Sequence, residues 1–156
     1  MSADTSLPPG QVSCTARIEG DAGKILEAWC DPVVQDHLFA GAAERVLDTQ
    51  GAVRWHLNAP LGRHPAATVS VVERMSTAVV HAIEGDGPWG ATSRLTVLPV
   101  QVGTGNEVTL WLEYEIDGVF ARLLASLVSV TPQAAAEEAL RRLRDWVQAQ
   151  PATSAG

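Results

Sequence analysis

The residues best suited to acid–base chemistry are one histidine and one tyrosine, each in a segment that alternates like a strand. His81 lies within Ala78–Glu84 and Tyr114 within Asn106–Asp117, and alternation places both side chains on the inner face of a sheet. A neutral imidazole, with a reference pKa near ~6.5, can remove a proton from a carbon beside a carbonyl. A tyrosine hydroxyl can donate a hydrogen bond to the enolate oxygen that develops. The pair could therefore provide the proton removal that an aldol closure requires.

Each of these two residues also has a structural interpretation. His81 could be a core histidine hydrogen-bonded to Ser70 across a strand pair, or it could point outward, because a slip of one residue inverts a strand. Tyr114 could be a core residue whose hydroxyl reaches the rim. The sequence leaves these interpretations open beside the catalytic one.

A larger set of apolar and weakly polar residues could line a ligand cavity. Ser70 and Ser93 could orient the carbonyls and hydroxyls of a ligand. Trp89 lies in the glycine-rich segment Gly85–Gly90 and could stand at the cavity mouth or pack on the last helix. The predicted substrate-binding residues are Trp29, Phe39, Trp55, Ser70, Trp89, Ser93, Leu95, Leu112, Phe120 and Leu124. For the apolar ones the alternative is an ordinary core position, which differs little from a cavity wall.

These side chains need a scaffold, which begins with a strand and two short helices. Gln11–Glu19 alternates as a half-buried strand does. Asp21 is a predicted N-cap for the first helix. Asp31 caps a second helix with Pro32 at its first position, and this helix ends near Phe39. Two helices inserted at this point must bridge the ends of the sheet.

Strand signals then dominate up to a final helix. Turn residues separate six predicted strands: Glu44–Asp48, Ala52–Asn58, Thr68–Arg74, Ala78–Glu84, Ala91–Val100 and Asn106–Asp117. Their connections are too short for parallel crossovers, so they form an antiparallel meander. From about Val119 the apolar period is helical, with a break at Thr131-Pro132. The residues predicted to face inward are Val53, Trp55, Leu57, Ser70, Val72, Val79, His81, Ile83, Ser93, Leu95, Val97, Val108, Leu110, Leu112 and Tyr114.

This order of elements predicts one α+β domain over residues 11–149. A curved antiparallel sheet of about seven strands would wrap around the long C-terminal helix and leave an enclosed apolar space. Residues 1–10 and 150–156 are rich in Ser, Thr, Pro, Ala and Gly and are expected to be flexible tails.

Composition and charge disfavour several kinds of function. The formal net charge of −7, from 11 Lys+Arg and 18 Asp+Glu, is unsuited to the nucleic-acid backbone. Arg141, Arg142 and Arg144 are expected to form a solvated helix face with intrahelical ion pairs. Cys14 and Cys30 are expected to be reduced thiols in a cytoplasmic protein, since no signal-peptide or membrane-span pattern is found. Dispersed histidines predict no metal, and we expect no cofactor.

Several short motifs occur in order between Gln11 and Val147. They are Ile25–Pro32, Val71–Arg74, Leu95–Pro99 followed by Gly103–Val108, and Leu140–Trp146. Through them the chain resembles the START/Bet v 1-like helix-grip superfamily (SRPBCC), and within it the bacterial polyketide cyclase/dehydrase branch. The stretch Asp36–Gly41 departs from the Trp and Pro-Gly that the family often shows there.

The resemblance implies a helix-grip fold and a polyketide cyclase- or aromatase-like enzyme. Such an enzyme would bind a small hydrophobic substrate and assist aldol cyclisation or dehydration, with His81 and Tyr114 as its catalytic residues. The alternative is a non-catalytic carrier of a lipid, a quinone or another hydrophobic metabolite, which fits the absence of a paired nucleophile and base. A third interpretation, an interaction domain, requires an exposed apolar patch. The sequence predicts no nucleic-acid partner and leaves a homodimer open.

Overall fold

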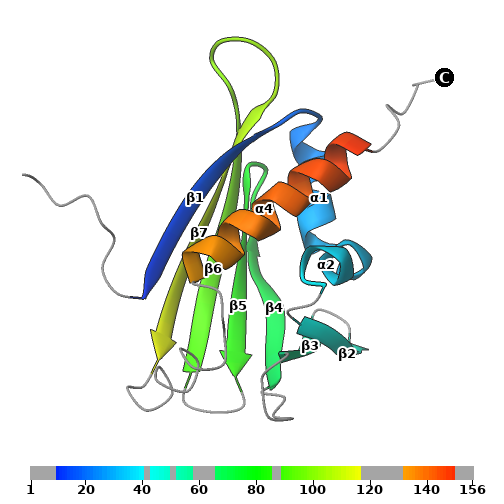
Figure 1. Cartoon of the computed structure of the whole chain (residues 1–156), viewed down its shortest axis with the longest axis vertical. Coiled ribbons are helices and arrows are strands. Elements are labelled where there is room, and N and C mark those ends of the chain that lie inside the picture. Colours follow the sequence, from blue (N-terminus) through cyan, green and yellow to red (C-terminus); the bar gives the residue numbers. More distant parts are fainter. Residues whose placement is uncertain are drawn as a thin grey trace, which may run out of the picture.

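The computed structural model describes residues 10–40, 43–49, 52–57, 66–85, 89–116 and 132–149. Seven strands and three helices lie in these ranges (Figure 1). In chain order they are β1 (Gln11–Ile18), α1 (Ala22–Cys30), α2 (Pro32–Leu38), β2 (Ala43–Thr49), β3 (Ala52–Leu57), β4 (Ala66–Arg74), β5 (Ala78–Gly85), β6 (Trp89–Pro99), β7 (Asn106–Ile116) and α4 (Pro132–Ala149).

The seven strands form one antiparallel sheet. Its order is β1-β7-β6-β5-β4-β3-β2, so the strands from β2 to β7 form a meander and β1 pairs with β7. The sheet curls into a half-barrel, and α4 crosses its concave side beside α1 (Figure 1). The predicted helix-grip architecture, with two short helices after the first strand, is confirmed.

Both short helices begin where the sequence predicts. The Asp21 carboxylate accepts a hydrogen bond from the Lys24 N–H at 3.2 Å, and the Asp31 carboxylate accepts one from the Val33 N–H at 2.9 Å. Pro32 stands at the start of α2, where a missing N–H leaves no bond unmade. These caps satisfy N–H groups that the first helical turn leaves unpaired, so local sequence alone fixes both helix starts.

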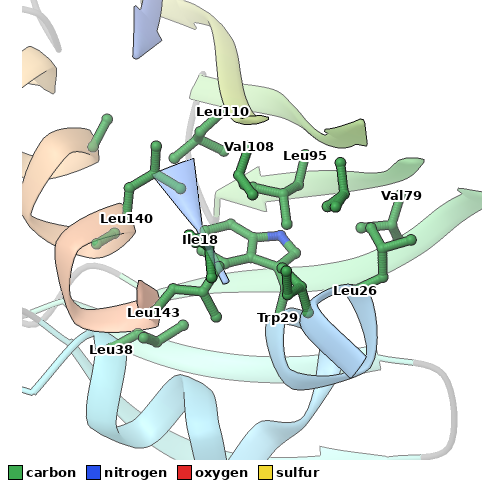
Figure 2. Close-up of a cluster of buried hydrophobic side chains, with 14 of the residues drawn as sticks. Ile18, Leu26, Trp29, Leu38, Val79, Leu95, Val108, Leu110, Leu140 and Leu143 are labelled. Atoms are coloured by element: carbon green, nitrogen blue, oxygen red, sulfur yellow. The ribbon is translucent and has the colours of Figure 1, made fainter. Parts of the chain in front are cut away.

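The core lies between the inner face of the sheet and helices α1 and α4. Helix α4 runs along β1 and contacts α1 and α2. Figure 2 shows Leu140 and Leu143 of α4 on one side of the core cluster, the sheet residues Leu95 and Val108 on another, and the Trp29 indole between them. Each buried leucine stabilises the fold by roughly 1.5–3 kcal/mol. Burial of this apolar face therefore holds α4 in the hollow of the sheet.

Strand boundaries differ from the predicted ones by a few residues. Strand β4 starts at Ala66 rather than Thr68, and β6 starts at Trp89 rather than Ala91. Helix α4 starts at Pro132, at the predicted break. None of the described helices is long and apolar enough to cross a membrane.

Some predicted features lie outside the described residues. They are the two tails, apart from Gly10, and the helical segment predicted from about Val119 to the break. Gly10 itself accepts a hydrogen bond from the Tyr114 N–H at 2.7 Å, which extends the pairing of β1 with β7 by one residue.

Candidate functional site

The inner face of the sheet is built of rows, because residues directly opposite each other on neighbouring antiparallel strands share a face. The first row is aliphatic apart from one thiol and consists of Cys14, Leu110, Leu95 and Val79. The second row, here the polar row, consists of Val12, Leu112, Ser93, His81 and Val71. The third row consists of Tyr114, Ala91, Ile83, Val69 and Val53.

Burial decreases from the first row to the third. Leu95 and Val79 in the first row are fully enclosed. Every member of the third row is only half-buried, although each side chain lies on the inner face. The polar row therefore marks the transition from the packed first row to the half-buried third row. Farther along the same face, Ala67 and Trp55 are buried again.

Two polar side chains are buried at this transition, on β5 and β6. His81 is 5% exposed and Ser93 is 6% exposed, and they lie directly opposite each other. Burial lowers the pKa of His81, because a charged imidazole loses its hydration there. The imidazole is therefore neutral near pH 7 and can act as a proton acceptor. The predicted inward facing of both residues is confirmed.

Neither the His81 imidazole nor the Ser93 hydroxyl has a hydrogen-bond partner among the residues that the structure describes. In the same part of the chain, every fully enclosed side-chain nitrogen or oxygen does have a partner. The polar atoms of His81 and Ser93 must therefore reach accessible space instead of being sealed into the core. Buried polar groups without internal partners need a partner from outside the chain, such as water or a bound small molecule.

The position of Ser70 corrects the sequence-based prediction. Ser70 pairs with Ala82, whereas His81 pairs with Val71, so Ser70 lies on the opposite face of the sheet from His81. A hydrogen bond between Ser70 and His81, the structural alternative for this histidine, is therefore excluded. Val72, also predicted to face inward, is 63% exposed at a β-bulge directly after Val71. The bulge adds one residue, which inverts the alternation along β4.

Tyr114 lies on the inner face, as predicted, one row from His81 and two strands away. A strand spacing of ~4.8 Å puts β5 and β7 about 10 Å apart. A ligand, rather than a direct contact, would have to connect the two side chains. Tyr114 is half-buried and packs against the edge of the core.

Three predicted binding residues form what we call the aromatic wall: Trp29, Phe39 and Trp55. They come from α1, from the residue after α2, and from β3. The Phe39 ring meets Trp29 edge-on, with centroids 6.1 Å apart, and Trp55 edge-on at 5.7 Å. Edge-to-face contacts of this kind are favourable because the positive ring edge meets a negative ring face. The wall joins the helices to β3.

The remaining predicted binding residues fall into two groups. Leu95 and Leu112 are on the inner face, Leu95 within the packed core and Leu112 half-buried in the polar row. The backbone of Trp89 opens β6, but its side chain lies outside the described part of the structure, as do Phe120 and Leu124 entirely.

Sequence reasoning missed two residues that hold the aromatic wall in place. Gln35 is buried, and its side-chain amide donates to the Trp29 carbonyl at 2.8 Å. Its position one turn before Leu38, on the apolar side of α2, was a usable signal. Arg142 forms the predicted intrahelical ion pair, with Glu138, but also donates to the carbonyls of Leu38 and Ala40. No local pattern indicates that contact.

The two cysteines are free thiols and poor nucleophiles. Burial, helped by the negative charge of Glu137, raises the pKa of Cys14 to about 11. Burial also raises the pKa of Cys30, although the positive charge of Arg74 opposes this. Among the described residues, no group of three or more His, Cys, Asp and Glu side chains could hold a metal ion. The chemistry available at the polar row is therefore that of a neutral imidazole and one hydroxyl.

Comparison with known proteins gives the fold. No family model matches the chain, and no curated protein matches it. A conserved protein from Geobacillus kaustophilus has a similar structure, with a TM-score of 0.69, 12% identity, and coverage of 88% of this chain and 95% of the other. A protein from Chromobacterium violaceum gives a TM-score of 0.66 at 14% identity, covering 90% of this chain and 99% of the other. One from Thermus thermophilus gives 0.62 at 21% identity, covering 89% and 97%. At these identities the similarity concerns the fold alone.

Proposed function

We propose that this protein is a member of the START/Bet v 1-like superfamily that binds a small hydrophobic molecule on the inner face of its sheet and acts on it as a polyketide cyclase-like enzyme. The observation that carries the proposal is the pair His81 and Ser93. Both are buried on an otherwise aliphatic face, yet their polar atoms reach accessible space. A site with apolar walls and a few convergent polar groups is typical of small-molecule binding.

The proposed reaction is an intramolecular aldol closure. The neutral His81 imidazole removes a proton from a carbon between two carbonyls, and the electron pair of the broken C–H bond moves to the carbonyl oxygen as an enolate. The Ser93 and Tyr114 hydroxyls donate hydrogen bonds to that oxygen. The enolate carbon then forms a C–C bond with a second carbonyl of the same molecule, and the imidazolium returns its proton to the new alkoxide. Holding the chain folded supplies much of the rate by proximity.

A second candidate is a carrier that binds without chemistry. It is favoured by one observation: no carboxylate among the described residues is hydrogen-bonded to His81, so nothing there orients the ring or stabilises its protonated form. A carrier needs no such partner. In that case the polar row would fix the orientation of a lipid, a quinone or a similar metabolite.

Binding is tested with N-phenyl-1-naphthylamine, an uncharged probe that becomes fluorescent in apolar sites. Wild-type protein should bind it saturably, and Ser93→Ala should weaken binding more than Ser70→Ala, since Ser70 lies on the opposite face. The absence of saturable binding by the wild-type protein would overturn both candidate functions.

Catalysis is tested by following the exchange of the α-hydrogens of 2-tetralone, a small hydrophobic ketone, in D₂O by ¹H NMR. We expect the wild-type protein to accelerate exchange and His81→Gln to lose most of that acceleration. Saturable probe binding without accelerated exchange would instead favour the carrier. Native mass spectrometry after gentle purification would then be expected to reveal an unaltered bound lipid.

A further inference from the structure

The backbone on both sides of Phe39, the central residue of the aromatic wall, is hydrogen-bonded to a side chain of helix α4. The Arg142 Nη1 atom donates hydrogen bonds to the carbonyl oxygens of Leu38 at 3.1 Å and of Ala40 at 2.9 Å. These carbonyls belong to the residues immediately before and after Phe39. Arg142 therefore holds both flanks of the residue whose ring contacts Trp29 and Trp55.

The position of this contact at the end of a helix makes it strong. The Leu38 carbonyl is at the C-terminal end of α2, where a carbonyl has no partner within the helix and lies at the negative end of its dipole, while Ala40 lies just beyond the helix. A guanidinium group supplies both hydrogen bonds and the complementary charge. The Arg142 side chain is only 31% exposed, so solvent screens the contact less than it would screen a surface pair.

The guanidinium group of Arg142 is itself oriented by Glu138, one turn earlier on α4. The Arg142 Nε atom donates to the Glu138 carboxylate at 3.0 Å. Hydrogen bonds from Arg141 and then Arg142 lower the pKa of Glu138 to about 2, so this carboxylate is ionised throughout the neutral range. Arg141 differs from Arg142 in one respect: its contacts to Glu138 and Asp145 all stay on α4. This makes Arg141 the matched control.

The opposite side of α2 is tied to the sheet. Arg45 on β2 contacts the Asp36 carboxylate through two hydrogen bonds, at 3.1 Å and 2.8 Å. The Arg45–Asp36 ion pair holds α2 at a residue inside the helix. The contact from Arg142 holds the end of the helix, next to Phe39. These two contacts therefore act on different parts of α2, which also meets α4 through the rings of His37 and Trp146, 5.1 Å apart.

We propose that Arg142 is a positioning residue: it sets the Phe39 ring between Trp29 and Trp55 and thereby sets the affinity of the inner face for an apolar ligand. The second part rests on the proposed function, because it requires that such a ligand binds there. The first part concerns the ring alone and is testable without a ligand.

The ring position is measured by ¹⁹F NMR of protein labelled with 4-fluorophenylalanine. The chain has only two phenylalanines, Phe39 and Phe120, so two resonances are expected and Phe39→Leu assigns them. Arg142→Gln should shift or broaden the Phe39 resonance, whereas Arg141→Gln should leave it in place. An unchanged Phe39 resonance in Arg142→Gln overturns the proposal. If Arg142→Gln does not fold, Arg142→Lys, which keeps a charged donor, must still move this resonance.

The effect on affinity is measured with N-phenyl-1-naphthylamine in a double-mutant cycle. Arg142→Gln should raise the Kd about 3- to 10-fold, the size of one aromatic contact, and Arg141→Gln should change it less than about 2-fold. In the Phe39→Ala background, Arg142→Gln should have less than about a 2-fold effect. An equal effect of Arg142→Gln with and without Phe39 overturns the positioning role. Wild-type protein that does not bind the probe overturns the proposed function, while the ¹⁹F result stands by itself.

Discussion

Protonation of His81 should couple the stability of this protein to pH. Its imidazole is 5% exposed and has no hydrogen-bond partner among the described residues, so nothing there compensates for burying a charge. Burial therefore lowers the pKa of His81 in the folded chain. Below the reference pKa of ~6.5, the unfolded chain binds a proton that the folded chain resists. The free energy of unfolding should thus be at its maximum above about pH 6.5. It should decrease as the pH falls from there through the folded-state pKa of His81.

The size of this effect has an upper limit. One proton bound by the unfolded chain alone changes the free energy of unfolding by ~1.4 kcal/mol per pH unit. Between about pH 6.5 and 5.5, His81 can therefore remove at most ~1.4 kcal/mol. Most carboxylates titrate below this range, so the slope there reports chiefly on histidines. In His81→Gln, which cannot titrate, this part of the slope should disappear.

Urea unfolding followed by tryptophan fluorescence, in buffers from about pH 7.5 to 5.5, measures the slope. Ser93→Ala is the matched control, because it alters the residue directly opposite His81 without removing a titratable group. It should shift stability at every pH and leave the slope at its wild-type value. A wild-type slope in His81→Gln would show that His81 is not the buried proton-excluding group, and the neutral-base argument would fail with it.

Two further predictions concern the core and the thiols. Leu143→Ala should lower the free energy of unfolding by about 2.7–5 kcal/mol, because Leu143 is fully buried between α4 and the sheet, whereas Arg144→Ala should cost less than about 0.5 kcal/mol. Equal costs in urea unfolding would contradict the docking of α4. With iodoacetamide at about pH 8, Cys14 in the folded protein should react on the order of 100-fold more slowly than a free thiol, since its pKa is raised from 9.0 to about 11. A fast reaction of Cys14 before unfolding would contradict its burial.

Alternation predicted the inner face correctly where the strands are regular. In β6, Ser93, Leu95 and Val97 alternate with outward residues without interruption, and all three are buried. One face of this central strand meets the helices, so polar and apolar residues separate cleanly. The polar row could therefore be predicted from sequence on β5, β6 and β7.

The same rule failed on β4 for a physical reason. Val71 and Val72 are consecutive valines, and the β-bulge sits at this point. Counting back by twos from Val72 places Ser70 inward, whereas the actual register puts Val69 and Val71 on the same face as Ile83 and His81, with Val71 45% exposed beside the bulge. A bulge inserts one residue, so side chains before and after it no longer follow one pattern of alternation between the two faces. Two adjacent β-branched residues do not reveal which of them is the extra one.

Contacts between residues far apart in the sequence could not be predicted from local patterns, for a different reason. The spacing of Phe39 from Trp29 and Trp55 in the sequence carries no information on whether the three rings meet. Likewise Arg141 and Arg142 have the same local charge pattern around Glu138, yet only Arg142 reaches across to α2. The difference is set by where α4 docks, which depends on the whole apolar face of the helix and the sheet.

The arrangement of the three rows also limits what the inner face can bind. The first row and the helices that cover it exclude water from one side of His81 and Ser93, while the third row on the other side is only half-buried. A ligand that reaches the polar row meets a neutral imidazole and a hydroxyl, and a charged ligand group placed there would lose its hydration without gaining a counter-charge from either. The ligand is therefore expected to be uncharged at that point and to present a carbonyl or hydroxyl oxygen. Within the proposed function, the choice between enzyme and carrier depends on which ligand atom lies beside the imidazole: an acidic C–H permits proton transfer, whereas an oxygen permits only orientation.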